Sequence, residues 1–197
     1  MPFIFKRLAL FLSISAAFAA DKDLTFRAQP VNSYAHHQTN SQVTIAVQPY
    51  TTEDQQKEPF GKLDLYRLGI LRVLVVIQND SGQAIRLDAM KAEYVGPNGS
   101  RAEATPAKDV RYLNPPKRPD VVVGPTTPKV GRSKKNPLDA WEVEGRSFTA
   151  KMLPASQSAS GFFYFESTLQ RGATIYLSGL REAGSGKELF YFEIPLE

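Results

Sequence analysis

The sequence predicts an all-β protein built as an antiparallel β-sandwich, and three observations support this. The stretch 70–79, ILRVLVVIQN, has five β-branched residues in ten and runs into the turn sequence Asn79-Asp80-Ser81-Gly82. Strand-like segments separated by turn signals recur along the chain and are most strongly apolar after Gly161. No segment sustains a helical period. Two packed antiparallel sheets would bury such strands.

The first twenty residues, 1–20, have the layout of a secretory signal peptide. Lys6 and Arg7 precede the apolar run Leu8–Ala17, and Ala17-Phe18-Ala19-Ala20 offers small residues at a cleavage site. The alternative, a membrane anchor, is disfavoured because this run is much shorter than the ~20 residues that span a bilayer. We therefore expect a periplasmic or secreted protein with no transmembrane segment after cleavage.

Composition limits what the mature chain can be. Without Lys6 and Arg7, the 24 Lys and Arg fall to 22 against 20 Asp and Glu, so net charge indicates no particular partner. The 42% apolar and 11% aromatic content can supply the core of one domain, which we place at 43–197. The sequence has no Cys, so neither disulfides nor thiol chemistry is available.

The N-terminal part predicts an arm, a strand and a helix in that order. Residues 21–42 are polar with little apolar periodicity, which predicts a mobile N-terminal arm. Val43–Val47 alternates towards Pro49 and predicts a first strand. Thr52 with Gln55 three residues later is the capping-box pattern, which predicts a short helix.

The stretch 70–79 is expected to be an interior strand because both of its faces are largely apolar. We expect it to pair, through the Ser81-Gly82 turn, with a strand that ends near Val95. A bulge at Asp88-Ala89 in that strand would accommodate a shift in the parity of the apolar residues. Pro97-Asn98-Gly99-Ser100 then predicts a turn, followed by a short return strand.

Residues 115–137 form a proline-rich basic segment that should not pack into a sheet. They hold six of the fourteen prolines and six cations against one acid, which predicts a long exposed loop inserted in the sandwich. The cations are Lys117, Arg118, Lys129, Arg132, Lys134 and Lys135. Val121–Val123 could add as an edge strand to a partner or to its own sheet. Asn136-Pro137 then predicts a short helix over 138–144.

The C-terminal third carries the strongest strand signal. Phe162–Phe165 is aromatic on both faces, and 173–177 alternates apolar residues. The segment 189–194 places Phe190, Phe192 and Ile194 on one face, after a hairpin turn at Gly184-Ser185-Gly186. In all, about seven short strands with one or two short helices indicate a sandwich of immunoglobulin-like type.

A resemblance supports this fold. The segment RVLVVIQNDSG at 72–82, paired with GFFYFE at 161–166 and a closing hairpin, resembles poorly characterised exported bacterial proteins with an immunoglobulin-like domain. In that group the first segment is the strand that leads to an Asn-rich turn, and the Gly-Phe strand starts the C-terminal half. The resemblance covers about 43–197 and carries no catalytic motif, and the basic insertion departs from a compact sandwich of this type.

Residues that could carry catalysis do not converge in the sequence. His36 and His37 are the two histidines, and both lie in the predicted arm, so we expect neither a metal site nor a catalytic base there. The acids Asp139, Glu142 and Glu144 could supply a glycosidase-like pair, but no spacing singles out two of them. We expect no cofactor.

The basic loop is the segment that we expect to contact a partner. Its six cations suit an envelope protein with an acidic surface, an acidic glycan or a lipid surface, and the alternative is a loop kept soluble by its charge. Nucleic acid is disfavoured because the chain is exported and the loop lacks interleaved aromatic residues. Trp141, the single Trp, could line a ligand groove, but we expect it to cover the open end of the sandwich.

Three functions remain open at this point. The first is an exported, non-enzymatic binding or scaffold domain of the bacterial cell envelope. The alternative is an exported hydrolase or carbohydrate-active enzyme that uses acids near 139–144. A third possibility is an accessory subunit of an envelope assembly, which would bind its partner through residues 115–137.

Overall fold

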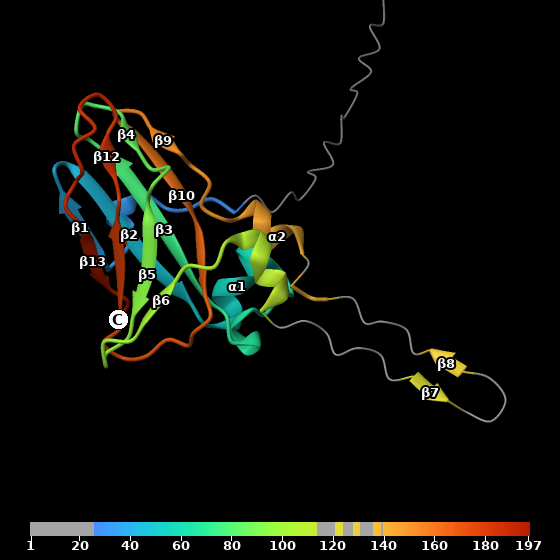
Figure 1. Ribbon diagram of the computed structural model, residues 1–197. Coiled ribbons are helices and arrows are strands. Elements are labelled where there is room, and N and C mark those ends of the chain that lie inside the picture. Colours follow the sequence, from blue (N-terminus) through green and yellow to red (C-terminus); the bar gives the residue numbers. More distant parts are fainter. Residues whose placement is uncertain (1–25, 114–120, 124–127, 131–135, 139) are drawn as a thin grey trace, which may run out of the picture.

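The computed structural model describes residues 26–113, 121–123, 128–130, 136–138 and 140–197. The predicted signal peptide lies outside the described residues. The described part consists mostly of antiparallel strands with a few short helices, as Figure 1 shows. The all-β prediction is therefore confirmed. In this part of the chain, no helix is both long and apolar enough to cross a membrane.

The strands of the described residues form two larger and two smaller antiparallel sheets. The first sheet contains, in spatial order, β1 (His37–Asn40), β2 (Val43–Tyr50), β3 (Leu71–Asn79) and β10 (Gln157–Phe165). The second contains β13 (Phe192–Pro195), β11 (Thr174–Ser178), β5 (Lys91–Val95) and β6 (Arg101–Glu103). The smaller sheets are β12 (Arg181–Glu182), β4 (Ile85–Arg86) and β9 (Met152–Leu153), and β7 (Val121–Val123) with β8 (Pro128–Val130).

Five short helical segments complete the described chain. They are η1 (Val31–Ser33), α1 (Glu53–Phe60), η2 (Tyr66–Leu68), η3 (Ala107–Tyr112) and α2 (Trp141–Gly145). The predicted capping box is confirmed: Gln55 N donates to Thr52 Oγ1 (3.4 Å), and Thr52 N donates to Gln55 Oε1 (3.1 Å). The helix predicted over 138–144 begins only at Trp141, because Asn136 caps a turn instead, accepting from Leu138 N.

The predicted interior strand is β3, and its position is confirmed. Val75 lies opposite Val47 of β2 on one side and opposite Gly161 of β10 on the other. Successive side chains of a strand point to opposite faces, so β3 contributes to two separate hydrophobic clusters. Both faces are buried, which explains why its sequence is almost continuously apolar.

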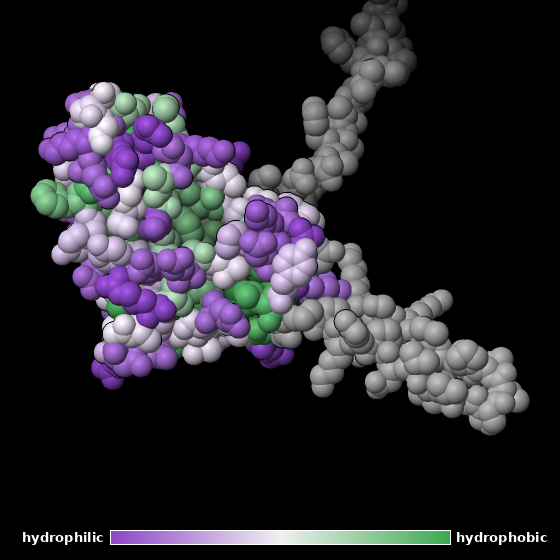
Figure 2. All heavy atoms as spheres, viewed as in Figure 1, coloured by the Kyte–Doolittle hydropathy of each residue, from purple (hydrophilic) through white to green (hydrophobic). Residues whose placement is uncertain are grey.

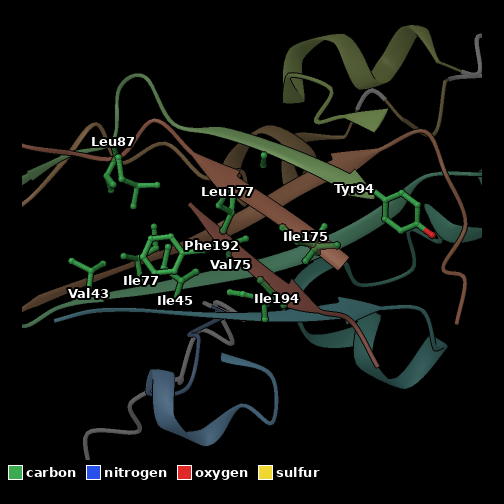
Figure 3. Packing of buried hydrophobic residues seen from close by; sticks show 14 of the residues in the cluster. Val43, Ile45, Val75, Ile77, Leu87, Tyr94, Ile175, Leu177, Phe192 and Ile194 are labelled. Atoms are coloured by element: carbon green, nitrogen blue, oxygen red, sulfur yellow. The ribbon is translucent and has the colours of Figure 1, made fainter. Parts of the chain in front are cut away.

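The first cluster fills the space between the two larger sheets. Figure 3 shows Val75 and Ile77 of β3 packed towards Ile175, Leu177 and Phe192 of the second sheet. Most of its members are completely inaccessible to solvent. This arrangement confirms that β3 packs against the C-terminal strands, and two sheets face to face define the sandwich.

The second cluster lies on the opposite face of the first sheet, beneath the helices. Leu74 of β3 and Phe162 of β10 meet Phe60 of α1, Val110 of η3 and Val143 of α2 there. The helical segments thus add a third layer on one side of the sandwich. An ordinary two-sheet sandwich leaves this face in water, and here the short helices bury it.

The predicted partner of β3 is wrong. The strand that ends at Val95, β5, belongs to the second sheet, whereas β3 pairs with β2 and β10. The parity shift at Asp88-Ala89 is not a bulge, because the chain leaves the small sheet after β4 and turns there, with Met90 N donating to Leu87 O (3.0 Å). A turn between two sheets shifts the alternation of apolar and polar residues by one position, as a bulge would.

The predicted mobile arm is also wrong over its described residues. Val31 in η1 is buried, and His37–Asn40 forms β1, paired with β2 in the register Thr39 to Thr44. The sequence signal failed because an edge strand contributes mainly backbone hydrogen bonds. Its side chains stay polar and show little apolar alternation.

The C-terminal strands are confirmed with one exception. In the β11 and β13 pair, Ile175 lies opposite Ile194 and Leu177 opposite Phe192. Phe190, predicted on the same buried face, is 76% exposed. It precedes the start of β13, so strand alternation does not extend to it, and Leu189 is buried instead.

Candidate functional site

The two side edges of the sandwich differ, and this difference locates the candidate site. At one edge β1 and β13 lie side by side, as Figure 1 shows. Side chains of β1 close this edge: Asn40 Nδ2 donates to Tyr191 O (2.9 Å), and Gln38 Oε1 accepts from Glu193 N (2.8 Å). These bonds use backbone groups that an open sheet edge would expose.

The opposite edge, between β10 and β6, contains a groove. The sheets are joined there by Thr105 N, which donates to Tyr164 O (2.7 Å). Beside this contact lies a half-open groove of about 390 Å³, within the range of small-ligand sites. Its lining residues are Met90, Lys91, Ala92, Glu103, Ala104, Thr105, Pro106, Ala107, Ser147, Phe148, Phe162, Phe163 and Tyr164.

A stacked pair of aromatic rings lines this groove. The rings of Phe148 and Phe163 lie 5.5 Å apart with an interplanar angle of 17°. Phe148 reaches this place because the segment 146–148 runs parallel to β10 and pairs with it at Phe162, with Phe162 N donating to Arg146 O and Phe148 N to Phe162 O. This close approach requires Gly161, since a Cβ there would lie 2.4 Å from Phe148 Cα.

The groove is mostly apolar and carries polar groups at its margin. Lys91 and Glu103 are exposed, and Thr105 and Ser147 add hydroxyl groups. Figure 2 shows apolar surface recessed between the polar strands β5 and β6 and the region of α2. Such a lining can bury an apolar group and leave a polar end in water.

A buried cation lies on the helix-covered side of the same sheet. Arg72 is completely inaccessible, donates from Nη2 to Tyr50 O (3.0 Å), and places its guanidinium 5.1 Å from the centre of the Phe60 ring. Burial lowers the pKa of the Arg72 guanidinium to about 10. Tyr164, which borders the groove, donates from its hydroxyl to Val143 O (2.7 Å), and burial raises its pKa.

Most of the basic residues predicted to contact a partner lie in parts of the chain that the structure does not describe. Lys117, Arg118, Arg132, Lys134 and Lys135 lie outside the described residues. Lys129 belongs to β8. Val121–Val123, predicted to add as an edge strand, forms β7 and pairs with β8 in a sheet of its own.

Trp141 does not cover the sandwich, so that prediction is wrong. Its side chain is 68% exposed at the start of α2, and the guanidinium of Arg146 lies 5.8 Å from its ring centre. It is not among the residues that line the groove. The core beneath α2 is filled by Val143 and Leu138 instead.

The acids near 139–144 do not gather at the groove. Glu144 is exposed and forms an ion pair with Arg111 (3.2 Å), Glu142 is half-buried, and Asp139 lies outside the described residues. Among the described residues, no group of three or more His, Asp or Glu is arranged to hold a metal ion. His37 lies in β1, with Nδ1 3.0 Å from Tyr34 O.

Sequence reasoning missed the groove although it described part of its lining. Phe163 belongs to the aromatic strand predicted at 162–165, and it is only half-buried. Phe148 lies between the helix predicted over 138–144 and that strand. Two features of the sequence could have indicated the groove. Phe148 is an isolated aromatic residue in a polar segment, and Gly161 stands at the start of the aromatic strand that follows.

Comparisons with known proteins add little. No protein-family model and no curated protein matches this chain. The solved structures similar to it include the "putative lipoprotein (ycdA)" from Bacillus subtilis, at 10% identity and a TM-score of 0.37, covering 81% of this chain and 38% of that one. Another is the structural genomics target SoR45, at 10% identity and a TM-score of 0.34, covering 79% of this chain and 83% of that one. This chain thus spans well under half of the length of the first.

Proposed function

We propose that this protein is an exported binding domain of immunoglobulin-like type that acts in the bacterial periplasm or outside the cell and performs no chemistry of its own. The signal-peptide pattern of residues 1–20 supports export. The groove between β10 and β6 is the observation that carries the binding role. We infer that it receives an apolar group of a partner protein of the cell envelope.

The composition of the groove supports this role. Stacked Phe148 and Phe163, together with Met90, Ala104 and Pro106, offer an apolar surface that water solvates poorly. A well-packed pocket of this kind is where the binding energy of an interface concentrates. The pairing of the segment 146–148 with β10 places the Phe148 ring against Phe163, so a partner would not have to form this aromatic surface on binding.

Site-specific photocrosslinking in the producing cell tests this proposal. A photoreactive amino acid replaces Ala104 in the groove, and the matched control places it at Lys62, which is exposed and does not line the groove. We expect a discrete adduct from position 104 on irradiation and none from position 62. Equal labelling at both positions, or none at either, would contradict a partner in the groove.

A second experiment addresses the basic loop, which we propose as an additional contact with an acidic envelope partner. Recovery of partners from membranes is compared for the full chain and for a variant without residues 115–137. Lower recovery with the shortened chain would support the contact. Equal recovery would assign the six cations to solubility and leave the groove as the binding site.

A further inference from the structure

We propose that one end of the sandwich, where the turn between β1 and β2 meets β12 beside the closed edge, carries a second site, which binds a neutral saccharide. The site joins a small polar hollow to two exposed aromatic rings. It is separate from the groove and goes beyond the binding role proposed above. The hollow has a volume of about 180 Å³ and is lined by Ser41, Gln42, Ser81, Gln83, Glu182 and Leu189.

The lining of the hollow matches the chemistry of a sugar. Hydroxyl and amide groups can each donate and accept hydrogen bonds, as sugar hydroxyls also do. Glu182 adds a carboxylate acceptor, and no lining residue is a cation, so an anionic ligand would not be favoured. A volume near 180 Å³ equals that of roughly six water molecules, which is the scale of one sugar ring.

The aromatic residues of the site follow directly, in the sequence, a residue that lines the hollow. Leu189 lines the hollow, and the next two residues, Phe190 and Tyr191, are 76% and 52% exposed. The Tyr191 ring is held in place by stacking on Tyr176, with 5.1 Å between the ring centres. A fixed, exposed ring offers a flat apolar face against which the C–H face of a sugar can pack.

Two amide side chains beside these rings are already fixed in position. Asn40 uses Nδ2 to bind Tyr191 O, and Gln38 uses Oε1 to accept from Glu193 N. Within the described residues, Asn40 Oδ1 and Gln38 Nε2 make no hydrogen bond, so one end of each amide remains for a ligand. Groups that are held before binding lose little conformational entropy when a ligand arrives.

The same features argue against a protein partner at this edge. Phe190 and Tyr191 are the two exposed aromatic residues in the chain between Leu189, which lines the hollow, and Glu193. A stable protein interface needs about 800 Å² on each partner and a central apolar region. Two rings are too few for that region, whereas they suit one or two sugar units.

Isothermal titration calorimetry on the signal-free full chain tests the proposal. The probes are maltohexaose, cellohexaose and chitohexaose, with polygalacturonate as the anionic comparison. We expect at least one neutral hexasaccharide to bind and polygalacturonate to bind more weakly. Phe190→Ala and Gln83→Ala should each weaken that binding about tenfold, the loss expected for one ring contact or one well-placed amide.

Tyr112→Ala is the matched control, because Tyr112 is also an exposed aromatic side chain, 68% accessible, but lies in η3 away from these two rings. It should leave saccharide binding unchanged. Binding of none of the four probes, or binding that survives Phe190→Ala, would overturn the proposal. A dimer in sedimentation equilibrium that Tyr191→Ala dissociates would assign this edge to self-association and would also overturn it.

Discussion

The core between the two sheets and the core beneath the helices are built on opposite faces of the same strand, and they differ in chemistry. Towards the second sheet, β3 presents the aliphatic side chains of Val73, Val75 and Ile77, and the buried Asn79 at its end is hydrogen-bonded to Leu153 O (3.0 Å). Towards the helices it presents Leu74 and Val76 around the buried cation of Arg72. The sheet-to-sheet core is stabilised mainly by apolar burial and contains no charged side chain among its cluster members, whereas the helix-covered core also contains a buried charge.

This difference shows which layer defines the fold. In the core between the two sheets, the buried polar groups are hydrogen-bonded: the Tyr94 hydroxyl donates to Thr168 O (3.1 Å) and Asn79 Nδ2 to Leu153 O (3.0 Å). In the helix-covered core, Arg72 Nε and Nη1 have no hydrogen-bond partner among the described residues. We therefore expect substitutions in the first core to be the more damaging, and some in the second to be tolerated.

The largest expected effect comes from placing a charge between the sheets. Val75→Asp should cost more than about 4 kcal/mol of unfolding free energy, because a carboxylate would lose its hydration without gaining a partner. Val95→Asp is the control, since Val95 is only half-buried on the outer face of β5, and should cost no more than about 1 kcal/mol. Urea unfolding followed by circular dichroism measures both. A Val75→Asp protein of wild-type stability would place the core elsewhere.

Gly161→Ala tests the close approach of the segment 146–148 to β10. The added methyl group would overlap the backbone of Phe148, so we expect a loss of about 2–3 kcal/mol and a disturbed groove. Ser160→Ala, on the exposed neighbouring residue, should be nearly neutral. Thermal unfolding compares the two variants, and equal melting temperatures would mean that the segment 146–148 yields freely.

Unlike the substitutions above, Arg72→Met should not lower the free energy of unfolding. Met fills a similar volume without a buried charge, so the free energy of unfolding should stay the same or rise by about 1–2 kcal/mol. Arg72→Ala, which leaves a cavity, should be less stable than Arg72→Met. If Arg72→Met instead lost several kcal/mol, the guanidinium would have to be stabilised beyond its bond to Tyr50 O and its contact with the Phe60 ring.

Thr52→Ala tests how firmly α1 is fixed over the second core. It removes the hydroxyl that accepts from Gln55 N and should cost about 1 kcal/mol. Thr52→Ser keeps that hydroxyl and should match the wild type. Denaturant unfolding with both variants checks this, and a loss shared by Thr52→Ser would indicate that the methyl group, not the cap, matters.

The smallest expected effect is a change in stability at high pH that depends on Tyr50. Burial raises the pKa of Tyr50 to about 12, above the ordinary value of 10.0. Between these values the unfolded chain loses the proton that the fold retains, so stability falls as pH rises through this range. Unfolding free energies at about pH 9 and about pH 11.5 should therefore decrease more for the wild type than for Tyr50→Phe. An equal decrease would mean that Tyr50 ionises freely in the fold.

Local sequence patterns were sufficient to predict a structural feature wherever one chemical cause determines that feature. The turn at 97–100, the capping box at Thr52 and the alternation of Ile175 and Leu177 all follow from contacts within a few residues or from burial of one strand face. The groove could not be predicted in this way. Phe148 and Phe163 are fifteen positions apart and meet because the segment 146–148 pairs with β10 beside Gly161.

The sequence by itself determined that the chain is mostly β and that 70–79 is an interior strand, because burial on both faces leaves an unbroken apolar run. It determined as well that the aromatic strand 162–165 belongs largely to the core. Only the tertiary structure decided which strands pair, since the alternation of a strand is the same whichever neighbour it has. It also decided that the polar segment 37–40 closes one edge of the sandwich while the opposite edge keeps a groove, because both depend on hydrogen bonds and contacts between distant parts of the chain.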